Sequence, residues 1–153
     1  MTTISALALV LLLLTVTTCA GLAWQRLHGR LRTARNTDRV DAAALGIELG
    51  ERATLLQFST RLCAHCRPAG IKLSRLADEH PGVLHHEIDL SDDLATAHRY
   101  QIMQTPTLLV LDPAGRTLLR SGGPPRMHEL AAFLTALPNR RQLSSPREKR
   151  AHA

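Results

Sequence analysis

The feature that most constrains this chain is the segment Cys63-Ala64-His65-Cys66, which lies between an expected strand and an expected helix. Two cysteines separated by two residues form either a redox couple or half of a zinc site. The apolar run at 54–59 is typical of a buried strand, and residues 71–77 carry apolar side chains at helical spacing. A four-cysteine zinc site needs a second pair, but the only other cysteine is Cys19, in a different environment. The pattern therefore favours a redox-active dithiol at a strand–helix junction.

Residues 1–24 are predicted to form a transmembrane signal-anchor helix. Residues 4–24 contain no charged side chain, and about 20 apolar residues span a bilayer core as a helix. Trp24 closes the stretch at a position that suits the membrane interface. A cleaved signal peptide is the alternative, but residues 2–10 lack Lys and Arg, and the apolar stretch exceeds the usual signal core. We therefore expect residues 4–24 to contact the lipid bilayer.

The net charge of +6 lies on the flanks of the chain. Residues 24–41 carry five Arg against two Asp, and residues 138–153 carry five basic residues against one Glu, whereas residues 42–137 carry nine basic and ten acidic residues. A nucleic-acid-binding domain carries its basic residues on the folded body, so we expect no nucleic acid partner. We interpret residues 25–43 as a basic linker and residues 138–153 as a disordered basic tail, either solvated or attracted to anionic headgroups.

Residues 44–137 are predicted to be one domain with strands at about 53–59, 83–89, 107–111 and 116–120, and helices at about 64–79, 92–100 and 126–136. With CxxC after the first strand, Thr105-Pro106-Thr107 before the third, and Gly122 before the last helix, this order resembles the thioredoxin family. The resemblance implies an α/β, thioredoxin-like fold, in which helices flank a central mixed β-sheet. Here one transmembrane helix precedes that fold.

The resemblance also implies thiol–disulfide exchange with protein disulfides and dithiols. Cys63 is the expected attacking thiolate because the start of a helix stabilises negative charge, and Cys66 is the expected resolving thiol of a redox Cys63–Cys66 disulfide. Thr105 and Pro106, which match the family's cis-proline loop, and Leu62 are the expected substrate groove. No separate cofactor is expected, since the cysteine pair carries the electrons. A redox partner, either a reductase or a membrane electron donor, is expected.

Three positions depart from the usual pattern of that family. Leu62 stands where Trp is common, and Gln57 stands where a buried Asp relays protons to the resolving thiol. A glutamine does not accept and release a proton at neutral pH, so resolution is left to water, His65 or another histidine. His65 replaces a proline between the cysteines, and in its protonated form it stabilises the Cys63 thiolate. We therefore expect a dithiol more oxidising than an ordinary thioredoxin.

Two features of the sequence predict opposite sides of the membrane for the folded domain. No Lys or Arg precedes the apolar stretch and five Arg follow within 15 residues of Trp24, so the positive-inside rule favours a single-pass protein of the cell membrane with a cytoplasmic domain. An oxidising dithiol suits the extracytoplasmic side, where such domains on signal anchors are also common. In the cytoplasm the couple would be kept reduced and would act as a reductase or thiol switch.

Two other functions remain as alternatives. A metal-binding relative would hold Cu(I) or Zn(II) with Cys63, Cys66 and a histidine, for which His85 and His86 are candidates, since soft thiolates select these ions. Copper-carrier relatives usually separate the cysteines by three residues, unlike this chain, so we assign no metal ligand. A non-catalytic, membrane-tethered adaptor is the other alternative, which the intact CxxC disfavours.

Overall fold

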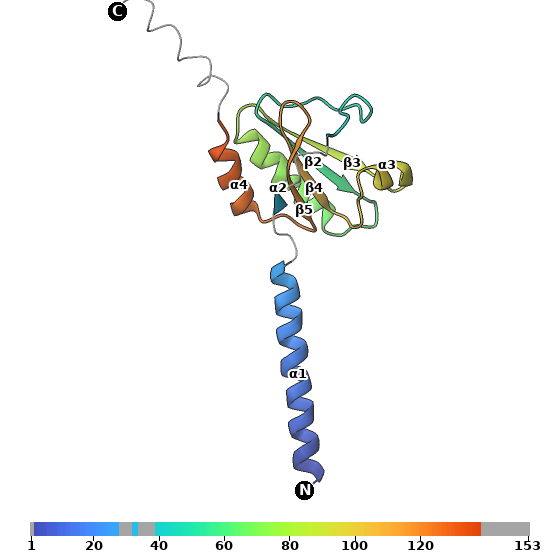
Figure 1. The fold of residues 1–153 in the computed structure, drawn as a ribbon, viewed down its shortest axis with the longest axis vertical. Coiled ribbons are helices and arrows are strands. Elements are labelled where there is room, and N and C mark those ends of the chain that lie inside the picture. The colour runs from blue at the N-terminus through green and yellow to red at the C-terminus, as the bar shows by residue number, and fades with distance from the viewer. Residues whose placement is uncertain (1, 28–31, 34–38, 139–153) are drawn as a thin grey trace, which may run out of the picture.

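The computed structural model describes residues 2–27, 32–33 and 39–138 (Figure 1). The elements in chain order are α1 (Thr2–Leu27), β1 (Arg32–Thr33), β2 (Ala53–Ser59), α2 (Cys66–Asp78), β3 (Val83–Asp89), α3 (Leu94–Arg99), β4 (Thr107–Leu111), β5 (Thr117–Gly122) and α4 (Met127–Ala136). The strand and helix order expected from the sequence is therefore present. The tail predicted at 138–153 lies, apart from Pro138, outside the described residues.

The strands form one mixed sheet in the order β1-β5-β4-β2-β3. β2 and β3 are parallel, and the other neighbours are antiparallel. Phe58 pairs with Thr107, which in turn pairs with Gly122. The end of β2, the start of β4 and the end of β5 thus meet at one edge of the sheet, which we call the disulfide edge because the CxxC segment follows β2 there. The mixed sheet flanked by helices confirms the predicted fold class.

Both faces of the sheet are covered, because every residue of β2 is buried. Successive side chains of a strand point to opposite faces. Leu55 accordingly packs in the cluster that α2 and α4 cover, whereas Leu56 and Phe58 pack in the cluster on the other face, beside Tyr100 and Ile102. Figure 1 shows α2 and α4 on one side of the sheet and α3 on the other. Gln57 follows Leu55 by two residues and so lies beneath α2.

The chain joins the sheet at the middle of β5, from the side of the disulfide edge. β1, which lies within the stretch predicted as linker, pairs antiparallel with β5, Arg32 opposite Arg120. Further along, Arg39 forms an isolated bridge with Arg116, at the other end of β5. Arg39 therefore lies farther from the disulfide edge than Arg32 does. Val40 follows it into the core and is 4% exposed, so the packed domain includes residues before 44.

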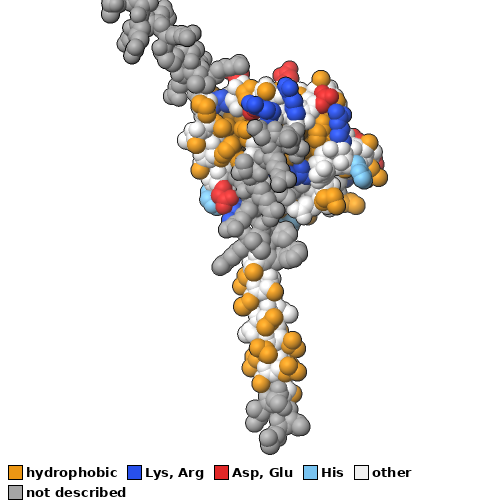
Figure 2. All heavy atoms as spheres, in the orientation of Figure 1, with side chains coloured by type: hydrophobic (Ala, Val, Ile, Leu, Met, Phe, Trp, Pro, Cys, Tyr) orange, Lys and Arg blue, Asp and Glu red, His pale blue; other side chains and the backbone are white. Residues whose placement is uncertain are grey.

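Helix α1 contains one segment, Ala6–Ala23, that is long and apolar enough to cross a membrane, although a signal sequence near the N-terminus has the same properties. Figure 2 shows hydrophobic side chains and no charged side chain along its described part. The hydroxyls of Thr15, Thr17 and Thr18 donate to helix carbonyls three or four residues earlier. These polar groups are therefore satisfied within the helix, as a lipid environment requires.

Candidate functional site

The candidate site is built around a disulfide between Cys63 and Cys66 at the start of α2, with Cα atoms 5.4 Å apart. The chain leaves β2 at Ser59 and turns, so that the Cys63 amide donates to the Thr60 carbonyl (3.1 Å) and the Cys66 amide to the Cys63 carbonyl (3.1 Å). Cys63 is half-buried, whereas Cys66 is 3% exposed. Cys63 is thus the more accessible of the two sulfur-bearing residues.

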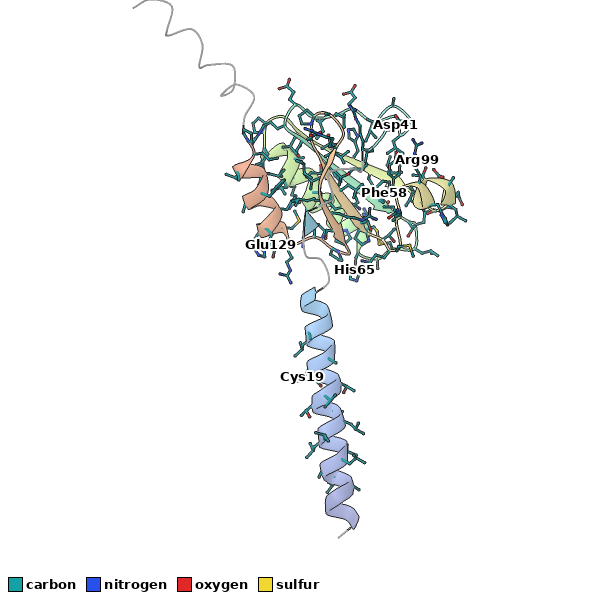
Figure 3. All side chains as sticks on the ribbon, viewed as in Figure 1. Cys19, Asp41, Phe58, His65, Arg99 and Glu129 are labelled. Atoms are coloured by element: carbon teal, nitrogen blue, oxygen red, sulfur yellow. A yellow bond between two sulfur atoms is a disulfide. The ribbon has the colours of Figure 1, made fainter. Side chains whose placement is uncertain are left out.

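Leu62 and His65 both lie on the outside of this turn. Leu62 is 98% exposed, and His65, the residue before α2, is also exposed. The His65 side chain makes no capping hydrogen bond to the helix. Figure 3 shows His65 at the end of the domain toward α1. The imidazole is therefore free to respond to solvent and to a partner at the cysteine pair.

The proline loop lies next to the cysteine turn. The Thr105–Pro106 peptide bond is cis, as the family resemblance implies. The Thr105 and Thr60 hydroxyls are 3.1 Å apart and share a hydrogen bond, while the Pro106 carbonyl accepts from the Gly123 amide at 2.7 Å. The loop is therefore tied both to the cysteine turn and to the end of β5. Met103, which the sequence did not single out, precedes it and is 92% exposed.

Gln57 lies directly beneath the cysteines with no exposed surface. Its Nε2 donates to the Cys66 carbonyl at 3.0 Å and to Glu87 Oε1 at 3.3 Å. Both partners are acceptors, which fixes the orientation of the amide group. Gln57 Oε1 is buried and has no hydrogen-bond partner within the part of the chain that the structure describes. Gln57, which stands where the family commonly has a relay carboxylate, thus connects Cys66 to a carboxylate on the neighbouring strand.

A cleft of about 470 Å³ opens beside the disulfide. It is lined by Ser59, Thr60, Arg61, Cys63, Cys66, Arg67, Glu87 and Asp89. Leu62, Thr105 and Pro106 are not among its lining residues, so the predicted substrate groove and this polar cleft are different surfaces. Glu87 was missed in the sequence because it lies 30 residues from Gln57; only the parallel register of β2 and β3, which pairs the two residues, brings them together.

The histidines considered as metal ligands lie on β3, opposite Leu55 and Leu56 rather than beside the cysteines. Burial lowers the pKa of His85. The nearby Glu87 carboxylate raises this pKa by a smaller amount, and His86 lowers it further. His86 Nε2 lies 3.0 Å from the Glu48 carbonyl. Among the described residues no group of three or more His, Cys, Asp or Glu side chains is arranged to hold a metal ion.

Comparisons with known proteins agree with this geometry. The model of the Thioredoxin family matches residues 43–136. Similar solved structures include thioredoxin-2 of the malaria parasite, described as a component of its protein secretion machinery, at 17% identity and TM-score 0.52 over 68% of this chain and 98% of that chain. A malarial protein (18%, TM-score 0.50, 55% of this chain and 94% of that chain) and Fasciola hepatica thioredoxin (24%, TM-score 0.49, 56% and 81%) are also similar. At these identities the likeness concerns the fold alone. No curated protein matches the chain.

Proposed function

Since this chain belongs to the thioredoxin family, we propose that it is a thiol–disulfide oxidoreductase that α1 holds in a membrane. The observation that carries the proposal is the Cys63–Cys66 disulfide at the start of α2, with an accessible first cysteine and a buried second one. In this arrangement the Cys63 thiolate attacks a disulfide of a protein substrate and forms a mixed disulfide. Cys66 then attacks Cys63, closes the internal disulfide and releases the substrate thiol.

The side chains around the pair have proposed roles in this cycle. Thr105 and Pro106 present an extended substrate segment to Cys63, and the exposed Leu62 adds an apolar contact. His65, exposed at the start of α2, favours the Cys63 thiolate when protonated and so makes the couple more oxidising. Gln57 orients the start of α2 through its hydrogen bond to the Cys66 carbonyl.

Insulin reduction in the presence of dithiothreitol tests the activity. The full chain is expected to precipitate insulin chains, Cys63→Ser is expected to be inactive, and Cys66→Ser is expected to accumulate a mixed disulfide. Absence of turnover, with both cysteines accessible to alkylation after reduction, would instead support the adaptor alternative. Equilibration with glutathione buffers tests the redox prediction: a potential near the thioredoxin value of about −270 mV would contradict an oxidising role for His65.

The membrane part of the proposal rests on α1, whose segment Ala6–Ala23 suits a span. The full chain is expected to float with lipid vesicles and to resist extraction at alkaline pH, whereas a chain beginning at residue 28 is not. Recovery of the mature protein without α1 would support a cleaved signal sequence. The arginines after Trp24 favour a cytoplasmic domain, and labelling of Cys63 in intact cells with a membrane-impermeant thiol reagent distinguishes the two sides.

A further inference from the structure

We propose that the disulfide edge faces the bilayer and that the redox partner is a second membrane protein, with a cysteine pair at the level of the lipid headgroups. This inference rests on the membrane anchoring proposed above. It is carried by the place where the chain enters the sheet, by the length of the connection to α1, and by the exposed side chains of that edge.

The connection between α1 and the sheet is short. Five Cα–Cα steps separate Leu27, the last residue of α1, from Arg32 in β1, so the two residues are at most about 18 Å apart. Arg32 pairs with Arg120, only two residues before β5 ends at Gly122. Arg120 is the fourth of the six residues of β5, so Arg32 lies near the middle of that strand, about 7 Å from its end at the disulfide edge. Thr33 pairs with Leu119, so β1 runs away from the disulfide edge and begins at its end nearer to that edge.

The opposite edge of the sheet lies farther from the anchor. The β4–β5 hairpin turns there, with the Gly115 amide donating to the Asp112 carbonyl at 2.9 Å. β5 contains six residues and spans about 20 Å between the two edges. Because α1 precedes the end of β1 that is nearer to the disulfide edge, the anchor places that edge toward the membrane. Figure 3 agrees, with His65 drawn on the side of the domain that faces α1.

The exposed side chains of this edge indicate what it meets. Leu62 and Met103 come from the two loops joined by the Thr60–Thr105 hydrogen bond, and they are 98% and 92% exposed. Apolar side chains at a membrane-facing edge suit a partner that is itself apolar near the interface. Lipids offer no group for thiol–disulfide exchange with the cysteine pair beside these residues, so a membrane protein that carries cysteines is the matching occupant.

The exchange balances without an additional reagent. A thiolate of the partner's dithiol attacks Cys63, and the Cys66 sulfur leaves as a thiolate and takes up a proton. The partner's second cysteine then closes the partner's disulfide and releases Cys63. Two electrons and two protons pass to this chain, and the reverse sequence returns them to a partner disulfide.

The test uses membrane peptides whose disulfide lies at two heights. One single-span peptide carries a Cys-Ser-Ser-Cys disulfide directly after its apolar stretch; a second carries it beyond a 27-residue helical Glu/Ala/Lys spacer, about 40 Å higher. Each is placed in phosphatidylcholine/phosphatidylglycerol nanodiscs with the reduced full chain. We expect the low disulfide to be reduced at least tenfold faster than the high one. A 20-residue Gly/Ser insertion after Leu27 is expected to remove most of that preference, because it reaches about 25 Å on average.

Spin labels provide a second, activity-independent measurement. In a Cys19→Ala, Cys63→Ser, Cys66→Ser background, labels at Met103→Cys and at Ala114→Cys, the matched hairpin control, are exposed to lipid-bound nickel. Stronger relaxation at 103 supports the proposal, and equal or stronger relaxation at 114 overturns it. Equal rates of reduction of the low and the high disulfide would overturn it too. So would strong relaxation of the label at 103 when neither peptide is reduced, because that result indicates a contact with lipid and not with a protein. If the chain did not float with vesicles, the proposed membrane anchoring would be wrong. If it failed to reduce the same disulfide in a soluble peptide, the proposed redox function would be wrong.

A second inference stands on a different observation, the polar contacts beneath α2. We infer that the Glu87 carboxylate takes the proton of Cys66 when that thiol closes the internal disulfide. This second inference rests on the resolving role proposed for Cys66. Glu87 lines the same cleft as both cysteines, and its Oε1 accepts from Gln57 Nε2, which also donates to the Cys66 carbonyl.

Gly70 makes room for this carboxylate. It lies one turn after Cys66 on the same side of α2, and glycine inside a helix costs about 1 kcal/mol relative to alanine. A Cβ at this position would lie 3.3 Å from Glu87 Oε2 and 3.4 Å from Gln57 Oε1. A side chain larger than glycine here would therefore crowd both oxygens. Gln57 Oε1 is buried and without a partner among the described residues, so a free acceptor lies on the same amide group that contacts Glu87.

The proposed step is a single proton transfer coupled to bond exchange. The Cys66 proton passes to Glu87, directly or through one water in the cleft. The Cys66–Cys63 bond then forms as the bond between Cys63 and the substrate sulfur breaks, and the substrate leaves as a thiolate. Glu87, which is exposed, returns the proton to solvent. The titratable and charged groups facing Glu87 are Arg61, Cys63, Cys66, Arg67, His85 and Asp89.

Reaction of the reduced Cys19→Ala chain, which lacks the third cysteine, with 5,5′-dithiobis(2-nitrobenzoate) tests the step, because it releases one nitrothiolate when Cys63 attacks and a second when Cys66 closes the disulfide. Every variant below is made in that background. Glu87→Gln is expected to slow the second release at pH 7 by at least about tenfold. The first release stays unchanged, and the difference decreases toward pH 9 as hydroxide deprotonates the thiol. Glu79→Gln, an exposed glutamate at the far end of α2, is the matched control.

Added formate is expected to accelerate the second release in Glu87→Ala and to leave the natural chain unchanged, a result that a purely structural role would not produce. An unchanged second release in Glu87→Gln, or an equal slowing of both releases, would overturn the inference. If the first release persisted in Cys63→Ser, the assigned order of the two cysteines would fail instead.

Discussion

Replacing Gln57 with Asp restores the carboxylate that the thioredoxin pattern commonly has at this position, yet we expect it to destabilise this protein. Gln57 has no exposed surface, and both of its hydrogen-bond partners are acceptors, the Cys66 carbonyl and Glu87 Oε1. A carboxylate there would face two acceptor oxygens without a donor, and one of them belongs to the Glu87 carboxylate. At about 4 Å and an effective dielectric of about 20, two like charges repel by about 4 kcal/mol. The new carboxyl group will therefore remain protonated in the folded state.

The sign of the pH dependence follows. An unfolded Asp titrates near pKa 3.9, whereas the folded carboxyl has a raised pKa, so the folded state binds the extra proton. Stability is then retained at low pH and falls as pH rises above about 4, by about 1.4 kcal/mol per pH unit until the folded pKa is reached. Between pH 4.5 and pH 7 we expect the variant to lose about 3 kcal/mol more than the natural chain.

Urea unfolding of the full chain in mild detergent, followed by far-ultraviolet circular dichroism, measures this loss. Gln57→Leu removes the same hydrogen bonds without adding a charge, so its loss of stability is expected to be independent of pH. Adding Glu87→Gln to Gln57→Asp supplies an amide donor and removes the repulsion, and should recover most of the pH-dependent part. A Gln57→Asp variant whose stability follows pH as the natural chain does would refute the contact between positions 57 and 87.

Three further predictions concern the hairpin, β3 and the cysteine turn. Asp112→Ala removes hydrogen bonds from the Ala114 amide and from the Arg116 amide and Nε, and should lower the free energy of unfolding by about 2–3 kcal/mol in urea titrations; an unchanged midpoint would contradict this. Burial lowers the pKa of His85, so its contribution is present above pH 6.5 and is lost as pH falls; His85→Gln should show a smaller loss of stability between pH 6.5 and 5, and an identical loss would rule this contribution out. His65→Ala should make the couple more reducing by at least about 30 mV in glutathione equilibria, equivalent to about 1.4 kcal/mol; no change would show that the imidazole does not influence the thiolate.

The sequence predicted those elements whose pattern is local. β2 and β3 have the expected bounds because each is a short apolar or alternating run ended by turn residues, and the cysteine pair lies at the predicted strand–helix junction. β1 was missed because two residues in a basic stretch carry no periodic signal; their pairing depends on β5, almost 90 residues later. Val40 was assigned to the linker for the same reason, since its burial arises from the hairpin and not from its neighbours.

The residues of the candidate site likewise fall into those with a local sequence motif and those placed by distant contacts. Cys63, Cys66 and Pro106 were recognisable because each belongs to a motif of fixed spacing. Glu87 was not, because its relation to Gln57 exists only in the parallel register of β2 and β3. Met103 was not, because an apolar residue in a loop gives no indication of its exposure. Contacts between segments distant in the chain are therefore what the structure adds to the motif.

The unusual residues beneath α2 belong to one arrangement. The buried amide of Gln57 brings an N–H donor that needs an acceptor. Glu87, at the paired position of β3, provides that acceptor. That carboxylate needs space under the helix, and Gly70 leaves it, at a position where a Cβ would approach both polar side chains within 3.4 Å. Gln57 alone suggests an impaired dithiol. Together with Glu87 and Gly70 it describes a site in which the carboxylate has moved from the strand beneath the helix to its neighbour, where solvent reaches it. A proton accepted from Cys66 then leaves through an exposed group, so closure of the disulfide by this chain should respond to bulk pH more directly than a fully buried relay would allow.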